Sequence, residues 1–295
     1  RPIRFIDRYK KYKAFKKDFG KFNVTPYTRN PDEVRKLHFD AVVIGSDIVW
    51  NYKLFGYDDL FFGGVNADRI VAYAPSFGWV NCGEEIPEPV CKGLVRFAAI
   101  GARDENTQKI AASCIGHPVD KVLDPTLICD FSDEVRVTDR IKKLGNYILV
   151  YAFAEQKPEI IASVKKFASS KGCQLIAVGS RQDWCDQVIM GAGPFEWLGF
   201  YKQASYVFTG TFHGTIFALK SKKKFVVSMN DAIFNKVTSL LTTVGLMDRI
   251  LEGAEVESIW NREIDYRQIE DTLEPHVEQS LTWLKTAVEE SVLSD

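Results

Sequence analysis

The chain has 295 residues, of which 46% are hydrophobic and 26% are charged, and its formal net charge is -1. This composition is typical of a globular protein with enough apolar material for packed cores, so intrinsic disorder is excluded. A chain of this length suits two domains better than one. Because the net charge is close to zero, we expect no nucleic acid partner, and local positive groups must bind any anionic ligand.

The six cysteines lack the C-x-x-C spacing of a zinc ribbon and the density of a disulfide-stapled secreted domain. They are Cys82, Cys91, Cys114, Cys129, Cys173 and Cys185. We therefore expect a cytoplasmic location and no metal site. The sequence contains no apolar run near the roughly 20 residues that span a bilayer, and no signal-peptide pattern. It begins at Arg1 rather than at a methionine, so we expect a truncated N-terminus.

The opening segment predicts a helix with one aromatic face. Its aromatic residues recur at steps of three and four, and basic residues greatly outnumber acidic ones around them. They are Phe5, Tyr9, Tyr12, Phe15 and Phe19. Two interpretations are open, namely an interfacial helix on anionic lipid, or a surface helix whose aromatic stripe packs on its own domain. We favour packing, because it explains the stripe without a membrane.

Short apolar runs rich in branched residues predict buried strands, and stretches of helical period lie between several of them. The predicted strands are 41–44, 70–73, 97–102, 147–151, 174–178, 206–209 and 225–228. This alternation predicts an α/β fold with two doubly wound, Rossmann-like domains. The polar segment 131–146 is the expected linker between a domain of residues 1–135 and one of residues 146–295. The tail 263–293 predicts an amphipathic helix with a break near Pro275.

The segment 39–51 predicts a strand that ends in a Gly-Ser-Asp turn. Gly45 permits a tight turn, and the side chains of Ser46 and Asp47 are suited to bind sugar hydroxyls. Trp50 is suited to stack on a pyranose ring. The alternative is that Ser46 and Asp47 only cap the helix that follows.

The segment 99–106 predicts a second strand, with Arg103 at its end. An arginine in this position is suited to bind a carboxylate or phosphate through two parallel hydrogen bonds. Alternatively, Arg103 forms an ion pair with Asp104, Glu105 or another carboxylate.

The segment 206–219 predicts a strand, a glycine-flanked turn and a helix. The backbone amides at such a helix start favour an anion, and glycines allow its close approach. His213 lies in this turn, at the end of a strand where doubly wound sheets place their ligands, and can donate a proton near neutral pH. A histidine here is also suited to cap or pack the helix.

Five segments in order, 39–51, 70–78, 99–106, 122–127 and 193–219, resemble the polysaccharide pyruvyl transferase family. The family's marks are the G-S-D-x-x-W-N block, the strand that ends in R-[DE]-E, and the F-H-G turn. Two features depart from the family pattern. Thr211 stands where many members have arginine, and nothing before Phe39 resembles the glycine-containing strand-helix unit with which members usually begin.

The resemblance implies a fold like that of GT-B glycosyltransferases, with ligands in a cleft between two domains. It implies a bacterial enzyme that moves the enolpyruvyl group of phosphoenolpyruvate onto a sugar, free or lipid-linked, without a metal or cofactor. On this basis residues 1–135 carry the acceptor side, and residues 146–295 carry the donor motif and a helical tail. The expected catalytic residues are His213, Arg103 and Asp47; the donor site is Gly210, Thr211, Gly214 and Thr215; and the acceptor site is Gly45, Ser46 and Trp50.

Two other functions are compatible with this fold. A nucleotide-sugar glycosyltransferase needs an acidic residue to bind ribose near the phosphate-binding helix, and the segment 211–229 contains none. A non-catalytic glycan-binding homologue would explain Thr211. The expected place of action is the cytoplasm, with peripheral contact at the inner face of the membrane.

Overall fold

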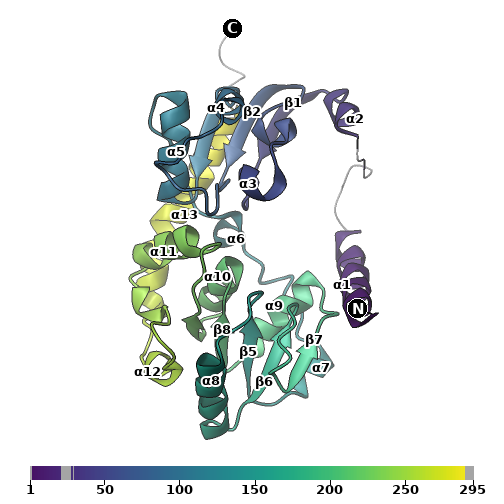
Figure 1. The fold of residues 1–295 in the computed structure, drawn as a ribbon, viewed down its shortest axis with the longest axis vertical. Helices are drawn as coiled ribbons and strands as arrows, with labels where there is room; N and C mark the ends of the chain where they lie inside the picture. The colour runs from purple at the N-terminus through teal and green to yellow at the C-terminus, as the bar shows by residue number, and fades with distance from the viewer. Residues whose placement is uncertain (1, 21–27, 29, 290–295) are drawn as a thin grey trace. The chain divides into compact units, whose positions relative to one another are not determined.

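A computed structural model describes residues 2–20, 28 and 30–289 (Figure 1). The chain forms two compact units. The N-terminal unit comprises residues 28, 30–129, 231–245 and 267–289, and the C-terminal unit comprises residues 2–20, 130–230 and 246–266. The sequence-based boundaries assumed that each domain is continuous, whereas the chain passes between the units several times.

The N-terminal unit contains a four-stranded parallel sheet in the order β1-β2-β3-β4. Its strands are β1 (Phe39–Ile44), β2 (Ala67–Tyr73), β3 (Ala99–Ala102) and β4 (Asp120–Lys121). Its helices are α2 (Pro31–Arg35), α3 (Tyr52–Phe55), η1 (Asp59–Phe62), α4 (Glu88–Leu94), α5 (Glu105–Ile115), α6 (Pro125–Ile128), α11 (Phe234–Thr243) and α13 (Tyr266–Glu289). Helical crossovers join the parallel strands, as such a sheet requires.

Apolar side chains of this sheet point alternately to two faces. Ala72 belongs to a core cluster that includes Leu94 of α4 and Ile110 of α5. The next residue, Tyr73, belongs to a cluster that includes Trp283 of α13. Helices therefore cover both faces. Helix α13 runs without interruption through Pro275, so the predicted break is wrong. Proline cannot donate a backbone hydrogen bond within the helix, but packing of the apolar stripe of α13 offsets this loss.

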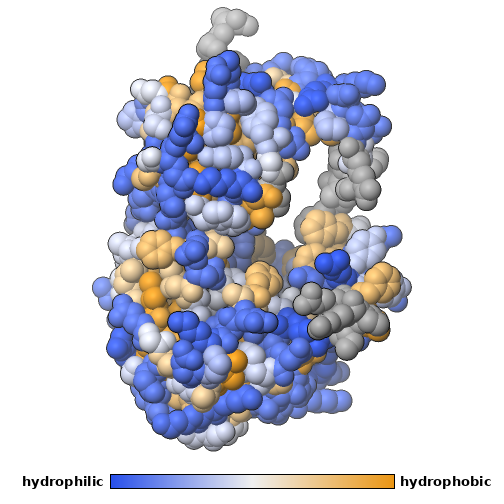
Figure 2. Space-filling model, viewed as in Figure 1, coloured by the Kyte–Doolittle hydropathy of each residue, from blue (hydrophilic) through white to orange (hydrophobic). Residues whose placement is uncertain are grey.

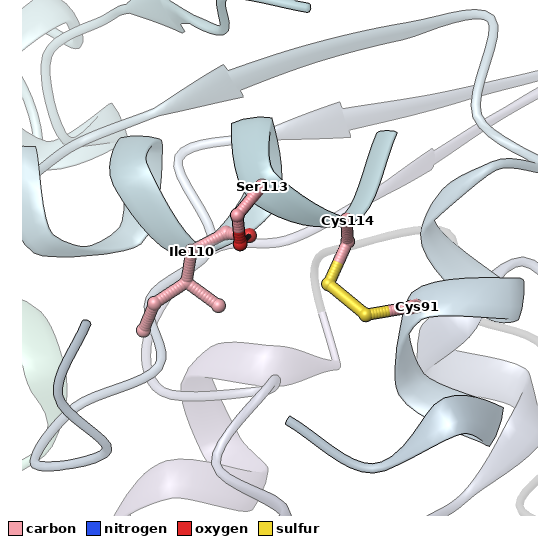
Figure 3. Close-up of a disulfide and its surroundings, with 4 residues drawn as sticks. All are labelled: Cys91, Ile110, Ser113 and Cys114. Atoms are coloured by element: carbon pink, nitrogen blue, oxygen red, sulfur yellow. Dashed lines mark hydrogen bonds between the residues drawn. A yellow bond between two sulfur atoms is a disulfide. The ribbon is translucent and has the colours of Figure 1, made fainter. Parts of the chain in front are cut away.

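A disulfide joins Cys91 of α4 to Cys114 of α5, whose Cα atoms lie 4.8 Å apart (Figure 3). The two helices pack against each other on the same face of the sheet. The scattered cysteines did not predict this bond, because only tertiary packing brings these positions together. The cytoplasmic location inferred from them stays a prediction.

The C-terminal unit contains a five-stranded parallel sheet in the order β7-β6-β5-β8-β9. Its strands are β5 (Tyr147–Tyr151), β6 (Gln174–Val178), β7 (Gln187–Ile189), β8 (Tyr206–Thr209) and β9 (Lys224–Val227). Its helices are α1 (Pro2–Phe19), α7 (Asp139–Lys142), α8 (Pro158–Ser170), α9 (Pro194–Gln203), α10 (Phe212–Lys220), η2 (Met247–Arg249) and α12 (Val256–Trp260). The strand order reverses between β5 and β8, which makes this sheet doubly wound.

The segment 131–146 is part of the C-terminal unit rather than a free linker. It contains α7, in which Ile141 is buried, and the Arg136 backbone N–H donates to the Phe195 carbonyl over 3.0 Å. Its polar composition suggested a linker, but backbone hydrogen bonds and one buried side chain are enough to hold it on α9.

Helix α1 docks on the C-terminal unit through its polar face. Arg181 pairs with Asp7, Arg136 pairs with Asp18, and Lys11 Nζ donates to the Gly179 carbonyl over 3.2 Å. Most of the aromatic stripe points away from the unit, since Phe5, Tyr9, Tyr12 and Phe19 are all at least half exposed, whereas Phe15 is half-buried. The prediction that this stripe packs on its own domain is therefore wrong, because ion pairs hold the opposite face.

Among the described helices, none is long and apolar enough to cross a membrane. The face of the molecule drawn in Figure 2 is mainly hydrophilic, with smaller apolar areas between the polar residues.

Candidate functional site

The turn after β1 places Asp47 at the carboxyl edge of the N-terminal sheet. A Cβ atom at Gly45 would lie 2.0 Å from the Tyr73 carbonyl oxygen, so glycine is required for this close approach. Asp47 itself has a left-handed backbone with φ 66°, which is uncommon for a residue other than glycine. The Asp47 carbonyl accepts a hydrogen bond from the Ser76 N–H over 2.8 Å, which fixes the turn against the segment after β2.

Arg103 follows β3 and lies between two carboxylates. Its Nη2 donates to Asp47 Oδ1 over 3.1 Å, and its Nη1 donates to Asp124 Oδ2. The side chains of Arg103 and Asp124 are each 1% exposed, whereas that of Asp47 is 58% exposed. Asp124 Oδ1 accepts from the backbone N–H and the hydroxyl of Thr126. Asp124 is thus an internal partner of Arg103, and Asp47 is the partner that reaches solvent.

Asp104 supports this arrangement from the start of α5. Its Oδ1 accepts from the Thr107 N–H and its Oδ2 accepts from the Ser76 hydroxyl, both over 2.7 Å. Asp104 therefore caps α5 and does not pair with Arg103. The suggested ion pair with Asp104 is wrong. Arg103 does pair with other carboxylates, but its side chain is buried, whereas a surface ion pair was expected.

Sequence reasoning missed Lys236, which α11 brings to the same place. Its side chain is 7% exposed, and its Nζ lies 3.9 Å from Asp47 Oδ1. The pKa of Lys236 is lowered from 10.5 to about 8, mainly by burial and then by the nearby Arg103, while Asp47, Asp104 and Asp124 act in the opposite direction. Nothing around Lys236 in the sequence signals this position. We call Asp47, Arg103, Asp104, Asp124 and Lys236 the charged cluster.

Trp50 lies in the core of the N-terminal unit. It is 0% exposed, its ring contacts Phe62, Phe77 and Phe97, and its Nε1 donates to the Phe61 carbonyl over 2.8 Å. Stacking of Trp50 on a sugar is therefore wrong for this structure, because apolar packing covers the ring.

The alternative that Ser46 and Asp47 cap the next helix is wrong as well. Asn51 caps α3, its Oδ1 accepting from the Leu54 N–H over 3.0 Å. Gly45, Ser46 and Asp47 remain at the carboxyl edge of the sheet, where a sugar-binding role for them stays a prediction.

The turn after β8 lies at the point where strand order reverses in the C-terminal sheet. The Gly210 N–H donates to the Tyr151 carbonyl at the end of β5 over 3.0 Å, and a Cβ at Gly210 would lie 3.1 Å from that of Ala152. His213 is half-buried in the first turn of α10, and its ring centroid lies 5.5 Å from that of Phe212. The predicted placement of His213 at a strand end is confirmed.

Three of the predicted donor-binding residues make contacts within the turn itself. Thr211 caps α10, its hydroxyl accepting from the Gly214 N–H over 3.0 Å, and the Thr215 hydroxyl donates to the Thr211 carbonyl over 3.0 Å. A Cβ at Gly214 would lie 2.1 Å from the Thr209 hydroxyl, so glycine is needed there for packing. Thr211 and Thr215 are buried, so we interpret them as residues that shape the turn.

The structure thus brings the predicted residues together in two groups, one per unit. Asp47 and Arg103 meet in the N-terminal unit, with Gly45 and Ser46 in the same turn as Asp47. Gly210, Thr211, His213, Gly214 and Thr215 form one turn in the C-terminal unit. A joint site made of both groups stays a prediction. In the described part of the chain, no group of three or more His, Cys, Asp or Glu residues is arranged to hold a metal ion.

Comparison with known proteins agrees with this α/β architecture. A putative UDP-N-acetylglucosamine 2-epimerase from Listeria monocytogenes has a similar structure, with a TM-score of 0.50 and 13% sequence identity over 87% of this chain and 75% of that one. At this identity the likeness concerns the fold alone. The dodecameric iron-containing heptosyltransferase TibC, in complex with ADP-D-beta-D-heptose, matches with a TM-score of only 0.29 and 12% identity over 85% of this chain and 76% of that one.

No curated protein sequence matches significantly. The family described as Polysaccharide pyruvyl transferase matches residues 9–231, which is more than half of the chain and includes both groups of predicted residues, whereas Lys236 lies beyond the matched range. The chain therefore belongs to the polysaccharide pyruvyl transferase family.

Proposed function

We propose that this protein transfers the enolpyruvyl group of phosphoenolpyruvate to a sugar of a cell-surface polysaccharide or exopolysaccharide, forming a pyruvate ketal and releasing phosphate. The observation that carries the proposal is the pairing of Arg103 with the half-exposed Asp47, in a chain of this family. The pair lies at the carboxyl edge of a parallel sheet, where α/β folds bind their ligands.

In this proposal Arg103 holds the carboxylate or phosphate of the donor. Its guanidinium is pre-positioned by Asp124, so little side-chain freedom is lost when an anion binds. Asp47 orients an attacking sugar hydroxyl or accepts its proton. Gly45 and Ser46 line the acceptor side, and binding needs neither metal nor cofactor.

His213 supplies the proton in the proposed reaction. It adds a proton to the methylene carbon of the enolpyruvyl group, which becomes a methyl group, and the central carbon is attacked by the first sugar hydroxyl. The bond from this carbon to phosphate breaks, and the second hydroxyl attacks. Of the two protons lost by the hydroxyls, one replaces the proton that His213 gave and the other leaves with phosphate. One phosphoenolpyruvate and one diol thus give one ketal and one phosphate. The α10 N-terminus assists by stabilising the negative charge of the donor.

The proposed acceptor is a free or lipid-linked sugar at the inner face of the membrane. The exposed aromatic stripe of α1, with basic residues beside it, supports peripheral contact with anionic lipid. The Cys91–Cys114 disulfide is more typical of an oxidising compartment than of cytoplasm.

The test is to incubate the protein with phosphoenolpyruvate or nucleotide sugars and a panel of glycan acceptors, measuring phosphate or nucleotide release and product mass. Phosphate release with a ketal-sized mass gain supports the proposal, whereas nucleotide release indicates a glycosyltransferase and no turnover indicates a binding protein. His213→Ala and Arg103→Lys should each remove most turnover. The exposed His276→Ala serves as the matched control and should retain it.

A further inference from the structure

Two buried cations in the N-terminal unit face the same carboxylate oxygen. Arg103 Nη2 lies 3.1 Å and Lys236 Nζ lies 3.9 Å from Asp47 Oδ1. The two cationic side chains are 1% and 7% exposed, whereas the Asp47 side chain is 58% exposed. Asp47 is thus the outermost member of the charged cluster, and the two cations lie beneath it.

The other two carboxylates of the cluster use both of their oxygens in contacts with neighbouring residues. Asp104 uses one oxygen for the Thr107 N–H and the other for Ser76. Asp124 uses one oxygen for Thr126 and the other for Arg103. An incoming anion that replaced either carboxylate would leave buried donors without acceptors, which is costly. Asp47 is therefore the carboxylate that an anion can replace.

The backbone of Asp47 does not need to move for such a replacement. Its carbonyl is held by the Ser76 N–H, and its position is further fixed by a bridge to Pro75. Rotation of the exposed side chain alone would turn the carboxylate toward solvent. The two cations would then be close together in a poorly solvated place, an arrangement that is stable only with an anion bound.

We propose that Arg103 and Lys236 form a two-cation site for a carboxylate or phosphate group, and that the Asp47 carboxylate occupies this site until a ligand displaces it. The identity of the physiological anion, the donor of the pyruvyl transfer, rests on the proposed function. The anion site itself does not.

The lowered pKa of Lys236 gives the site a pH dependence. As pH rises through about 8, Lys236 loses its proton and one of the two cations disappears. The charged groups facing Lys236 are Arg103, Asp47, Asp104 and Asp124. Anion binding should therefore weaken as pH rises through about 8.

The experiment measures sulfate binding to the full chain by isothermal titration calorimetry, since sulfate keeps its charge throughout this pH range. Lys236→Met should weaken sulfate binding about tenfold or more, as expected for loss of a charged hydrogen-bond donor. Asp47→Asn should tighten it, because an internal competitor is removed. Lys236→Arg should keep the affinity but lose its decline above pH 8. Lys223→Met is the matched control, a partly buried lysine of the C-terminal unit whose pKa is also lowered by burial.

Unchanged affinity in Lys236→Met, or weaker binding in Asp47→Asn, would overturn the inference. Circular dichroism of each variant establishes that it is folded, and the opposite signs for positions 47 and 236 cannot arise from general destabilisation. Failure of the proposed function can be distinguished from failure of this inference. If sulfate binding follows these expectations but phosphoenolpyruvate gives no turnover, the anion site stands and the pyruvyl transfer does not.

Discussion

Replacing Lys236 by methionine should make the protein more stable at neutral pH. The lysine side chain is 7% exposed, and its charged form is penalised mainly by burial. Methionine has a similar length and no charge to desolvate. If Lys236 contributed only to stability, its replacement would be expected to make the protein less stable. A gain in stability therefore indicates that Lys236 serves another purpose.

The magnitude follows from the pKa of Lys236, which is about 8 in the folded protein instead of 10.5. Between these pH values the unfolded chain holds a proton that the folded chain lacks, so the stability of the wild type rises with pH. Below about 8 both states are protonated and the penalty is constant, at about 3 kcal/mol. Lys236→Met should therefore gain up to about 3 kcal/mol below pH 8, and the gain should vanish near pH 10.5.

The assay is urea-induced unfolding of both proteins, followed by tryptophan fluorescence at pH values below 8 and near 10.5. Other groups titrate in this range, but they are the same in both proteins and cancel in the difference. Because the chain has two units, urea can give two unfolding transitions. The transition whose midpoint shifts on substitution of Lys236 is that of the N-terminal unit. A variant less stable than the wild type below pH 8, or a gain of the same size at both pH values, would refute the reasoning.

Three further outcomes are expected. Arg103→Ala leaves Asp124 buried without its cation and should lower the free energy of unfolding by about 3–5 kcal/mol, and an unchanged free energy of unfolding in urea titrations would contradict this. Cys114→Ser should lower the free energy of unfolding by about 3 kcal/mol, and reductant should lower it in the wild type but not in the variant. Serine at both Tyr9 and Tyr12 should reduce sedimentation with anionic vesicles but leave neutral vesicles unaffected, and unchanged sedimentation would count against lipid contact by α1.

The sheets were predictable because their central strands are continuous apolar runs. The predicted strands 147–151, 174–178 and 206–209 coincide with β5, β6 and β8, and 225–228 lies within one residue of β9. The edge strands β4 and β7 were missed. They span only Asp120–Lys121 and Gln187–Ile189, too short and too polar for an apolar run to show them.

The site was predictable only in part, because a sequence motif shows which residues lie near a strand end but not which way each side chain points. Asp47 and Arg103 were placed correctly, since both follow strands of one parallel sheet. Trp50 comes three residues after Asp47, yet its ring turns into the core. Lys236 was invisible because α11 follows β9 of the other unit in the chain, and only the tertiary fold returns it to Asp47.

The charged cluster is better explained by ligand binding than by stability. Buried ion pairs repay their desolvation poorly, and apolar residues of similar volume often stabilise a protein more. Arg103 with Asp124 alone would be a closed pair, in which each charge is fully matched. The addition of Lys236 places a second cation in a poorly solvated position and lowers its pKa, and the carboxylate that offsets it has an uncommon left-handed backbone at a solvent-exposed edge. Such an arrangement costs stability when no ligand is bound and recovers it only when an anion binds, which is the behaviour expected of a binding site.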